Sequence, residues 1–113
     1  MDIARNDRGG IAVLVLKGRL NQGSADALHS AAMEIAGDQD CKALVVDMGG
    51  VDFIASVGIR SLIRPSQALS MRGGKLAVAN LNPQIDEFFR LTGLDQMFRV
   101  YTTVDEAVAG VTS

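Results

Sequence analysis

Three short apolar runs constrain the fold of this chain more than any other feature of its sequence. They are Ile11–Lys17, Ala43–Met48 and Lys75–Asn80, and each is rich in the aliphatic or β-branched residues typical of buried strands. Segments with helical spacing separate them, and this alternation predicts an α/β fold with a mostly parallel sheet. The turn-forming pair Gly9-Gly10 adds an antiparallel component, because a strand before Gly9 can pair with Ile11–Lys17 as a hairpin.

Four helices are expected between and after these strands. Ser24 can cap the first, which Gly37 ends, and the second begins at or just after Ser56. Asn82-Pro83 opens the third, and Thr103 caps the last, over 104–111, after a short strand at 98–101. The core-facing stripes of the first three are Leu28, Ala31, Ala32 and Ile35; Ile59, Leu62, Ile63, Ser66 and Leu69; and Ile85, Phe88, Phe89 and Thr92.

Three positions carry more specific expectations. The pair Gly49-Gly50 ends the strand Ala43–Met48 and opens a loop before the second helix. Pro65 falls inside that helix and has no N–H for the Ser61 carbonyl, which predicts a kink rather than an end, because the apolar stripe resumes further on. His29 lies off the stripe of the first helix and is expected to be an exposed helical residue.

Length and composition favour one compact domain over residues 1–113 and exclude several functions. The net charge of −2 leaves no basic footprint for nucleic acid. Cys41 is the only cysteine and His29 the only histidine, so neither an internal disulfide nor a zinc site is expected, and no other metal or cofactor is implied. The chain has neither a secretory core at its start nor an apolar stretch of membrane-spanning length, which predicts a cytoplasmic protein without a membrane partner.

Catalytic motifs are incomplete. A serine between a strand and a helix resembles the G-x-S-x-G elbow of hydrolases, yet Ile54 occupies the first glycine position before Ser56, and His29 has no reason to approach as a base. The glycine pairs do not follow the order of phosphate-binding loops. Asp47 and Asp52 flank one loop, but no acidic pair follows the first strand to complete a magnesium pocket. The chain is therefore not expected to be an enzyme.

Ser56 remains the residue with the clearest chemical interpretation. At a helix start its hydroxyl lies at the positive end of the helix dipole, beside unpaired backbone N–H groups. Such a serine is either a plain N-cap or a place that accommodates a phosphate, and the spacing alone leaves both open.

The chain as a whole resembles the STAS family (sulphate transporter and anti-sigma factor antagonist), in particular its stand-alone bacterial antagonists. Four stretches in order carry the resemblance, and together they cover nearly all of the chain. They are 16–21 (LKGRLN), 44–48 with 51–59 (LVVDM and VDFIASVGI), 73–76 (GGKL) and 91–94 (LTGL). The resemblance implies a small mixed sheet of about five strands with four helices mainly on one face.

The resemblance also implies a function. In the family, the serine at the position of Ser56 accepts phosphate from an anti-sigma factor serine kinase of the GHKL type. Phosphorylation releases the antagonist from this kinase, and a PP2C-type phosphatase resets it. The expected partner-binding residues are Asn21, Gln22, Asp52, Ala55, Val57, Gly58, Arg60 and Arg64. Arg60 and Arg64, four residues apart, would share a helix face and meet acidic groups of the partner.

Three residues depart from the family pattern. Ala55 replaces an aspartate, Val57 replaces a second hydroxyl residue, and Asn21 stands where antagonists often carry an acid. A second hypothesis therefore stays open: a STAS scaffold module of a sensory complex or a lipid transporter, without a phosphorylation switch. A weak homodimer is compatible with either function.

Overall fold

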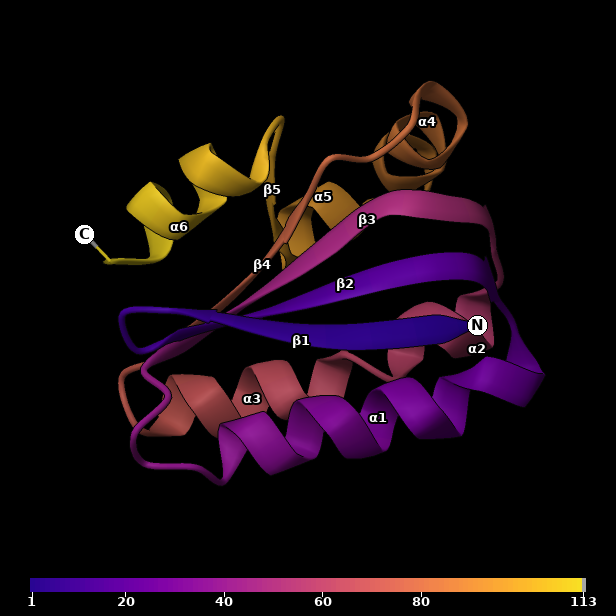
Figure 1. Cartoon of the computed structure of the whole chain (residues 1–113). Coiled ribbons are helices and arrows are strands. Elements are labelled where there is room, and N and C mark those ends of the chain that lie inside the picture. The colour runs from indigo at the N-terminus through magenta and orange to yellow at the C-terminus, as the bar shows by residue number, and fades with distance from the viewer. Residues whose placement is uncertain (113) are drawn as a thin grey trace.

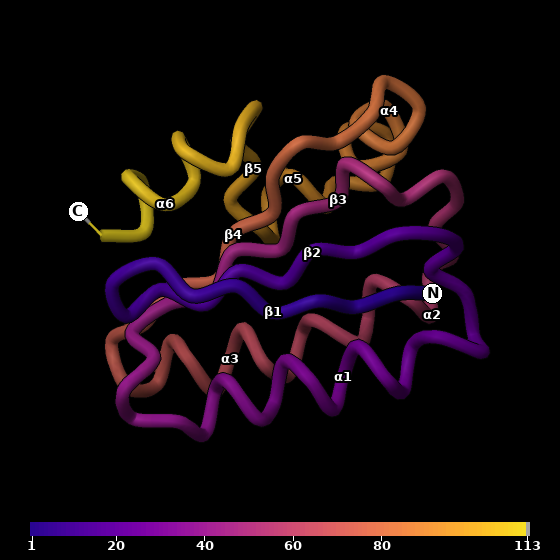
Figure 2. Tube along the Cα trace, in the orientation of Figure 1, coloured from indigo at the N-terminus to yellow at the C-terminus, as the bar shows by residue number. Residues whose placement is uncertain are grey.

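One five-stranded mixed sheet organises the chain. A computed structural model describes residues 1–112 (Figures 1 and 2). The strands are β1 (Asp2–Arg8), β2 (Ile11–Leu20), β3 (Ala43–Ile54), β4 (Lys75–Ala79) and β5 (Arg99–Tyr101), in the order β1-β2-β3-β4-β5. Only the β1 and β2 pair is antiparallel, and the other three pairs are parallel. The predicted parallel sheet with an N-terminal hairpin is confirmed.

Helices cover the two faces of the sheet unequally (Figure 1). On one face lie α1 (Gln22–Ala36), α2 (Ser56–Arg60) and α3 (Ile63–Met71), while α6 (Val104–Thr112) packs on the other. The larger core combines alternate residues of β2 and β3 with the apolar stripes of α1 and α3. It also takes in Ile85, Phe89 and Leu94 from α4 (Pro83–Thr92) and α5 (Leu94–Met97), beside the end of β3. No helix within residues 1–112 is long and apolar enough to cross a membrane.

The first helix begins three residues earlier than the sequence indicated. Asn21, not Ser24, is the N-cap of α1, and its side chain accepts a hydrogen bond from the Ser24 backbone N–H. The Ser24 hydroxyl accepts in turn from the Asn21 N–H, which completes a reciprocal capping box. The usual capping box has Glu or Gln at the third helical position, and the sequence pattern did not predict this box because Ser24 occupies that position.

The glycine pair 49–50 does not end β3, contrary to expectation. The strand continues to Ile54, and its pairing with β2 shifts register in this region. A Cβ at Gly50 would lie 2.7 Å from Lys17 Cγ and 2.8 Å from the Leu16 carbonyl oxygen. These glycines therefore let neighbouring groups approach the backbone within a continuous strand, a use of glycine typical of bulges.

The expected kink at Pro65 is wrong, because the helix is interrupted instead. It ends at Arg60 and a new helix starts at Ile63, so Pro65 occupies the first turn of α3, where backbone N–H groups have no helical partner. The Ser61 carbonyl faces Nδ1 of His29 at 3.2 Å, and the Ser61 hydroxyl donates to the Gly58 carbonyl. His29 belongs to α1, and its contact with this break leaves it half-buried rather than fully exposed.

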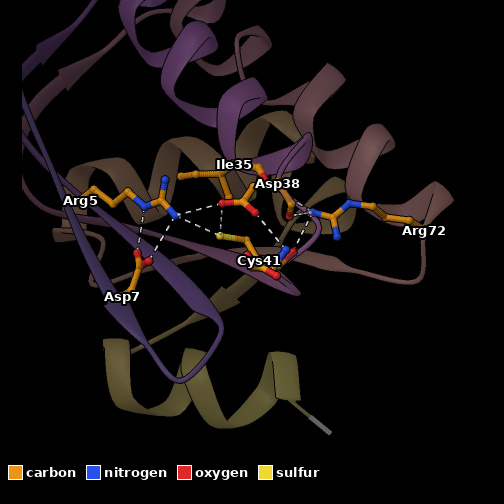
Figure 3. A network of polar contacts seen from close by, with 7 residues as sticks. Arg5, Asp7, Ile35, Asp38, Cys41 and Arg72 are labelled. Carbon is orange, nitrogen blue, oxygen red and sulfur yellow. Dashed lines mark hydrogen bonds and ion pairs between the residues drawn. The ribbon is translucent and has the colours of Figure 1, made fainter.

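A polar cluster fixes the loop after α1 (Figure 3). Arg72 donates from Nε to the Ala36 carbonyl at 2.9 Å and from Nη2 to the Cys41 carbonyl at 2.7 Å, with further bonds from Nη2 to the Ile35 and Asp38 carbonyls. From the opposite side, Arg5 of β1 donates to the Cys41 sulfur at 3.1 Å. Burial raises the pKa of the Cys41 thiol, and the hydrogen bond from Arg5 lowers the pKa of Asp7.

Candidate functional site

Ser56 lies where two neighbouring parallel strands end. Leu20 at the end of β2 pairs with Ile54 at the end of β3, and the Ala55 N–H donates to the Leu20 carbonyl at 2.9 Å. The chain leaves β2 into α1 and leaves β3 into α2, so the beginnings of these two helices meet at one edge of the sheet (Figure 1). This pairing brings Asn21 and Gln22 beside the segment that carries Ser56.

Ser56 is exposed and is the first residue of α2. The N-cap is Ala55, whose backbone is extended, so the interpretation of Ser56 as a plain N-cap is wrong. Within residues 1–112 its hydroxyl has no hydrogen-bond partner, and it is free to react with or contact another molecule. The helix that it opens has only five residues, so the dipole argument made from a longer helix is correspondingly weaker.

Gly58 determines how closely α2 approaches the sheet. It is buried, and a Cβ at this position would lie 2.6 Å from Leu20 Cγ and 2.8 Å from the Leu20 carbonyl oxygen. No side chain fits there without displacing the helix. Gly58 therefore acts on the expected partner surface by positioning Ser56 and Val57, since its own atoms are covered.

Two exposed apolar side chains flank Ser56. Phe53 is 39% exposed and Val57 is 40% exposed, although large apolar residues are usually buried. The guanidinium carbon of Arg19 lies 4.2 Å from the centroid of the Phe53 ring, a cation–π contact. Sequence reasoning included Val57 but missed Phe53, because the strand was expected to stop at Met48, whereas β3 continues to Ile54 with Asp52 and Phe53 both exposed.

A shallow groove of about 140 Å³ continues this apolar surface toward α4. Phe53, Ile85 and Phe88 supply its apolar lining, together with Asp52, Ile54 and Gln84. The groove shows that the exposed apolar area extends beyond the Ser56 loop.

The charged residues predicted for the site have no ion-pair partner within the described part of the chain. They are Asp52, Arg60 and Arg64, and all three are exposed. Arg60 ends α2 and Arg64 lies in the first turn of α3, so the shared helix face expected from their spacing is interrupted. We use the name Ser56 surface for Asn21, Gln22, Asp52, Phe53, Ala55, Ser56, Val57, Arg60 and Arg64.

Comparison with known proteins assigns the family. Residues 2–107 match the STAS domain, and the chain belongs to the STAS domain family, as the sequence motifs predicted. It is 34% identical over 107 residues to the anti-sigma-F factor antagonist RsfB of Mycobacterium tuberculosis (strain ATCC 25618 / H37Rv), a match that covers 93% of this chain and 84% of RsfB. Such relatives are regulators rather than enzymes, in agreement with the expectation from the incomplete catalytic motifs.

Solved structures confirm the fold. The crystal structure of an anti-sigma factor antagonist from Mycobacterium paratuberculosis superposes with a TM-score of 0.88 at 29% identity, covering 99% of this chain and 94% of that one. The phosphorylated form of the Bacillus cell fate determinant SpoIIAA superposes with a TM-score of 0.73, covering 97% and 99% of the two chains. Its identity of 16% supports the likeness of fold alone.

Proposed function

We propose that this chain is an anti-sigma factor antagonist that works by partner exchange in the cytoplasm. In its unmodified form it binds an anti-sigma factor serine kinase of the GHKL type through the Ser56 surface. The kinase phosphorylates Ser56 and releases the antagonist, and a PP2C-type phosphatase restores the binding form. Support comes from the antagonist relatives.

The observation that carries the proposal is the exposed Ser56 hydroxyl, without an internal partner, beside two exposed apolar side chains. Phe53 and Val57 offer contact area that a partner would remove from water, and aromatic residues are frequent hot spots of interfaces. A reactive group within such a contact area allows a small modification to control a large interface.

The effect of phosphorylation follows from charge. A phosphate adds about 1.5 to 2 negative charges at pH 7. An unpaired or like-charged group buried in an interface costs about 2 to 5 kcal/mol, which corresponds to roughly 30-fold to several-thousand-fold weaker binding. Such a loss is sufficient for partner exchange, and it requires no change of fold.

A second candidate function is a STAS scaffold module without a phosphorylation switch. Ala55 and Val57 favour it, since both replace polar residues of the family pattern next to the acceptor serine. In this role the apolar part of the Ser56 surface binds a partner constitutively, within a sensory complex or a lipid transporter.

The two functions make opposite predictions for Ser56 variants. The GHKL-type kinases encoded in the same genome are purified and titrated with wild type, Ser56→Ala and Ser56→Asp by calorimetry, and phosphate incorporated from ATP is mapped by mass spectrometry. We expect a single phosphate on Ser56, persistent kinase binding by Ser56→Ala in the presence of ATP, and at least several-fold weaker binding by Ser56→Asp. The aspartate effect is smaller than that of phosphate because a carboxylate carries less charge.

Ser70→Asp is the matched control, because Ser70 is an exposed serine at the far end of α3. It should bind the kinase like wild type. If wild type is never phosphorylated while all variants bind one partner equally, the scaffold function replaces the switch.

A further inference from the structure

We propose that Arg60 is the internal counter-ion of a phosphate on Ser56, so that phosphorylation withdraws Arg60 from the partner as well as adding charge. This inference rests on the proposed function for its biological meaning, since it concerns regulation of the same site. The pairing itself is a property of this chain alone and is tested without any partner.

Helix geometry brings the two side chains together. Ser56 and Arg60 are the first and last residues of α2, separated by four positions. Residues at this separation are neighbours on a helix surface, with about 5 to 6 Å between their Cβ atoms. The anionic residue also precedes the cationic one, which is the more favourable order for an ion pair within a helix. Both side chains are exposed, so neither needs to leave the core in order to meet the other.

Arg60 is available for this role. Within residues 1–112 it forms no ion pair or hydrogen bond, whereas Arg5, Arg8 and Arg90 each lie within 4.0 Å of a carboxylate. A guanidinium binds phosphate oxygens through two parallel N–H groups, and such charge-assisted hydrogen bonds are stronger than neutral ones. An unpartnered arginine therefore gains more from a new phosphate than one already engaged.

Two other arginines, Arg19 and Arg64, are less suitable as counter-ions of a phosphate on Ser56. Arg19 is already held over the Phe53 ring, and Arg64 belongs to α3, beyond the helix break at 61–62. The acid nearest to Ser56 in sequence is Asp52 on β3, and the preceding residue is Ala55, where the family pattern has an aspartate. No residue directly next to Ser56 in the sequence thus carries a carboxylate that would oppose the pairing of the phosphate with Arg60.

The consequence for a partner is twofold. In the unmodified protein, Arg60 is free to meet an acidic group on the kinase. After phosphorylation, the phosphate introduces negative charge into the interface and also occupies the guanidinium that an acidic group of the kinase would have used.

Phosphorus NMR tests the pair directly. Phosphoserine is incorporated at position 56 of the full chain during translation. The second pKa of its phosphate, ordinarily about 6, is then measured by titration. A positive charge favours the dianion, so it lowers this pKa. We expect the pKa in the otherwise wild-type chain to lie about 0.2 to 0.4 unit below that in Arg60→Gln, the size of an ion pair at this helix spacing.

Two variants separate Arg60 from general electrostatics. Arg60→Lys keeps the positive charge and should retain part of the shift, whereas Arg64→Gln should leave the pKa unchanged. Equal pKa values in the wild-type background and in Arg60→Gln would overturn the proposal, and so would loss of the shift in Arg64→Gln alone. Because phosphoserine is supplied by translation, the titration decides the pair even if no kinase binds the protein, an outcome that would count against the proposed function only.

Discussion

Replacement of Gly58 by alanine tests whether close contact between α2 and β2 sets the position of the Ser56 surface. The added Cβ would lie 2.6 Å from Leu20 Cγ and 2.8 Å from the Leu20 carbonyl oxygen, whereas carbon atoms pack favourably at about 3.5 to 4.0 Å. The carbonyl is part of the backbone and already accepts a hydrogen bond from Ala55. Relief therefore requires α2 to move away from the sheet by about 1 Å.

Two opposing effects set the change in the free energy of unfolding. Overpacking of a well-packed site costs about 1 to 3 kcal/mol. Alanine is more favourable than glycine within a helix by about 0.5 to 1 kcal/mol, which offsets part of this loss. We expect Gly58→Ala to be less stable than wild type by about 0.5 to 2 kcal/mol.

Urea unfolding followed by far-ultraviolet circular dichroism measures this difference, and amide NMR shifts report the displacement of residues 55–60. Gly23→Ala is the matched control, since Gly23 lies in the first turn of α1 and the nearest atom to its added Cβ, Asn21 Oδ1, is at an ordinary 3.4 Å. It should be as stable as wild type or slightly more so. A Gly58→Ala protein with wild-type stability and unshifted amides at 55–60 would refute the packing argument.

Two further predictions concern the polar cluster that fixes the loop after α1. Arg72→Ala should lower the free energy of unfolding by about 2 to 3 kcal/mol, because it removes charged hydrogen bonds to four carbonyl groups. Arg90→Ala, which loses only an exposed pair with Asp86, should cost at most about 0.5 kcal/mol in the same urea assay. Burial raises the pKa of the Cys41 thiol in the folded state, so its contribution to stability is complete at neutral pH and declines as the pH rises above about 8.5, where the unfolded thiol ionises first. Between pH 7 and 10 the free energy of unfolding should therefore fall less in Cys41→Ala than in wild type. The same pH dependence in both proteins would contradict the burial argument.

Hydrophobic pattern was sufficient to predict the architecture. The order of the strands from β2 to β4 and of the longer helices followed from apolar runs and stripes, because burial of these residues dominates the choice of local structure, whereas the short helix α5 was not expected. The Asn82 and Thr103 caps were also predicted correctly, since each uses a side chain whose capping bond depends only on local backbone geometry. Local chemistry of this kind is visible in one segment of sequence.

Features that depend on distant segments were not predictable in the same way. The helix break at 61–62 involves the ring of His29, which lies 32 residues earlier in the sequence. The continuation of β3 through the glycine pair depends on a close fit to β2 and to Asn80. In both cases the tertiary neighbour decides the local outcome, and a single window of sequence does not contain that neighbour.

The structure changes the local roles expected for several of the predicted site residues. Ser56 is exposed at the start of a helix as expected, yet Asn21 caps α1 and Gly58 is a buried spacer. Phe53 was overlooked because its exposure depends on how far β3 extends. A family motif suggests candidate positions, whereas coordinates distinguish the side chains that face outward from those that hold the others in place.

The break between α2 and α3 also has a consequence for how binding specificity can diverge in this family. Because α2 is separated from α3 at 61–62, its exposed positions can change without altering a longer helix. The internal requirements of the segment are a glycine at 58, apolar residues at 59 and 62, and the buried Ser61, whose hydroxyl donates to the Gly58 carbonyl. The exposed side chains of residues 55–62 can thus change while the sheet and the remaining helices stay the same.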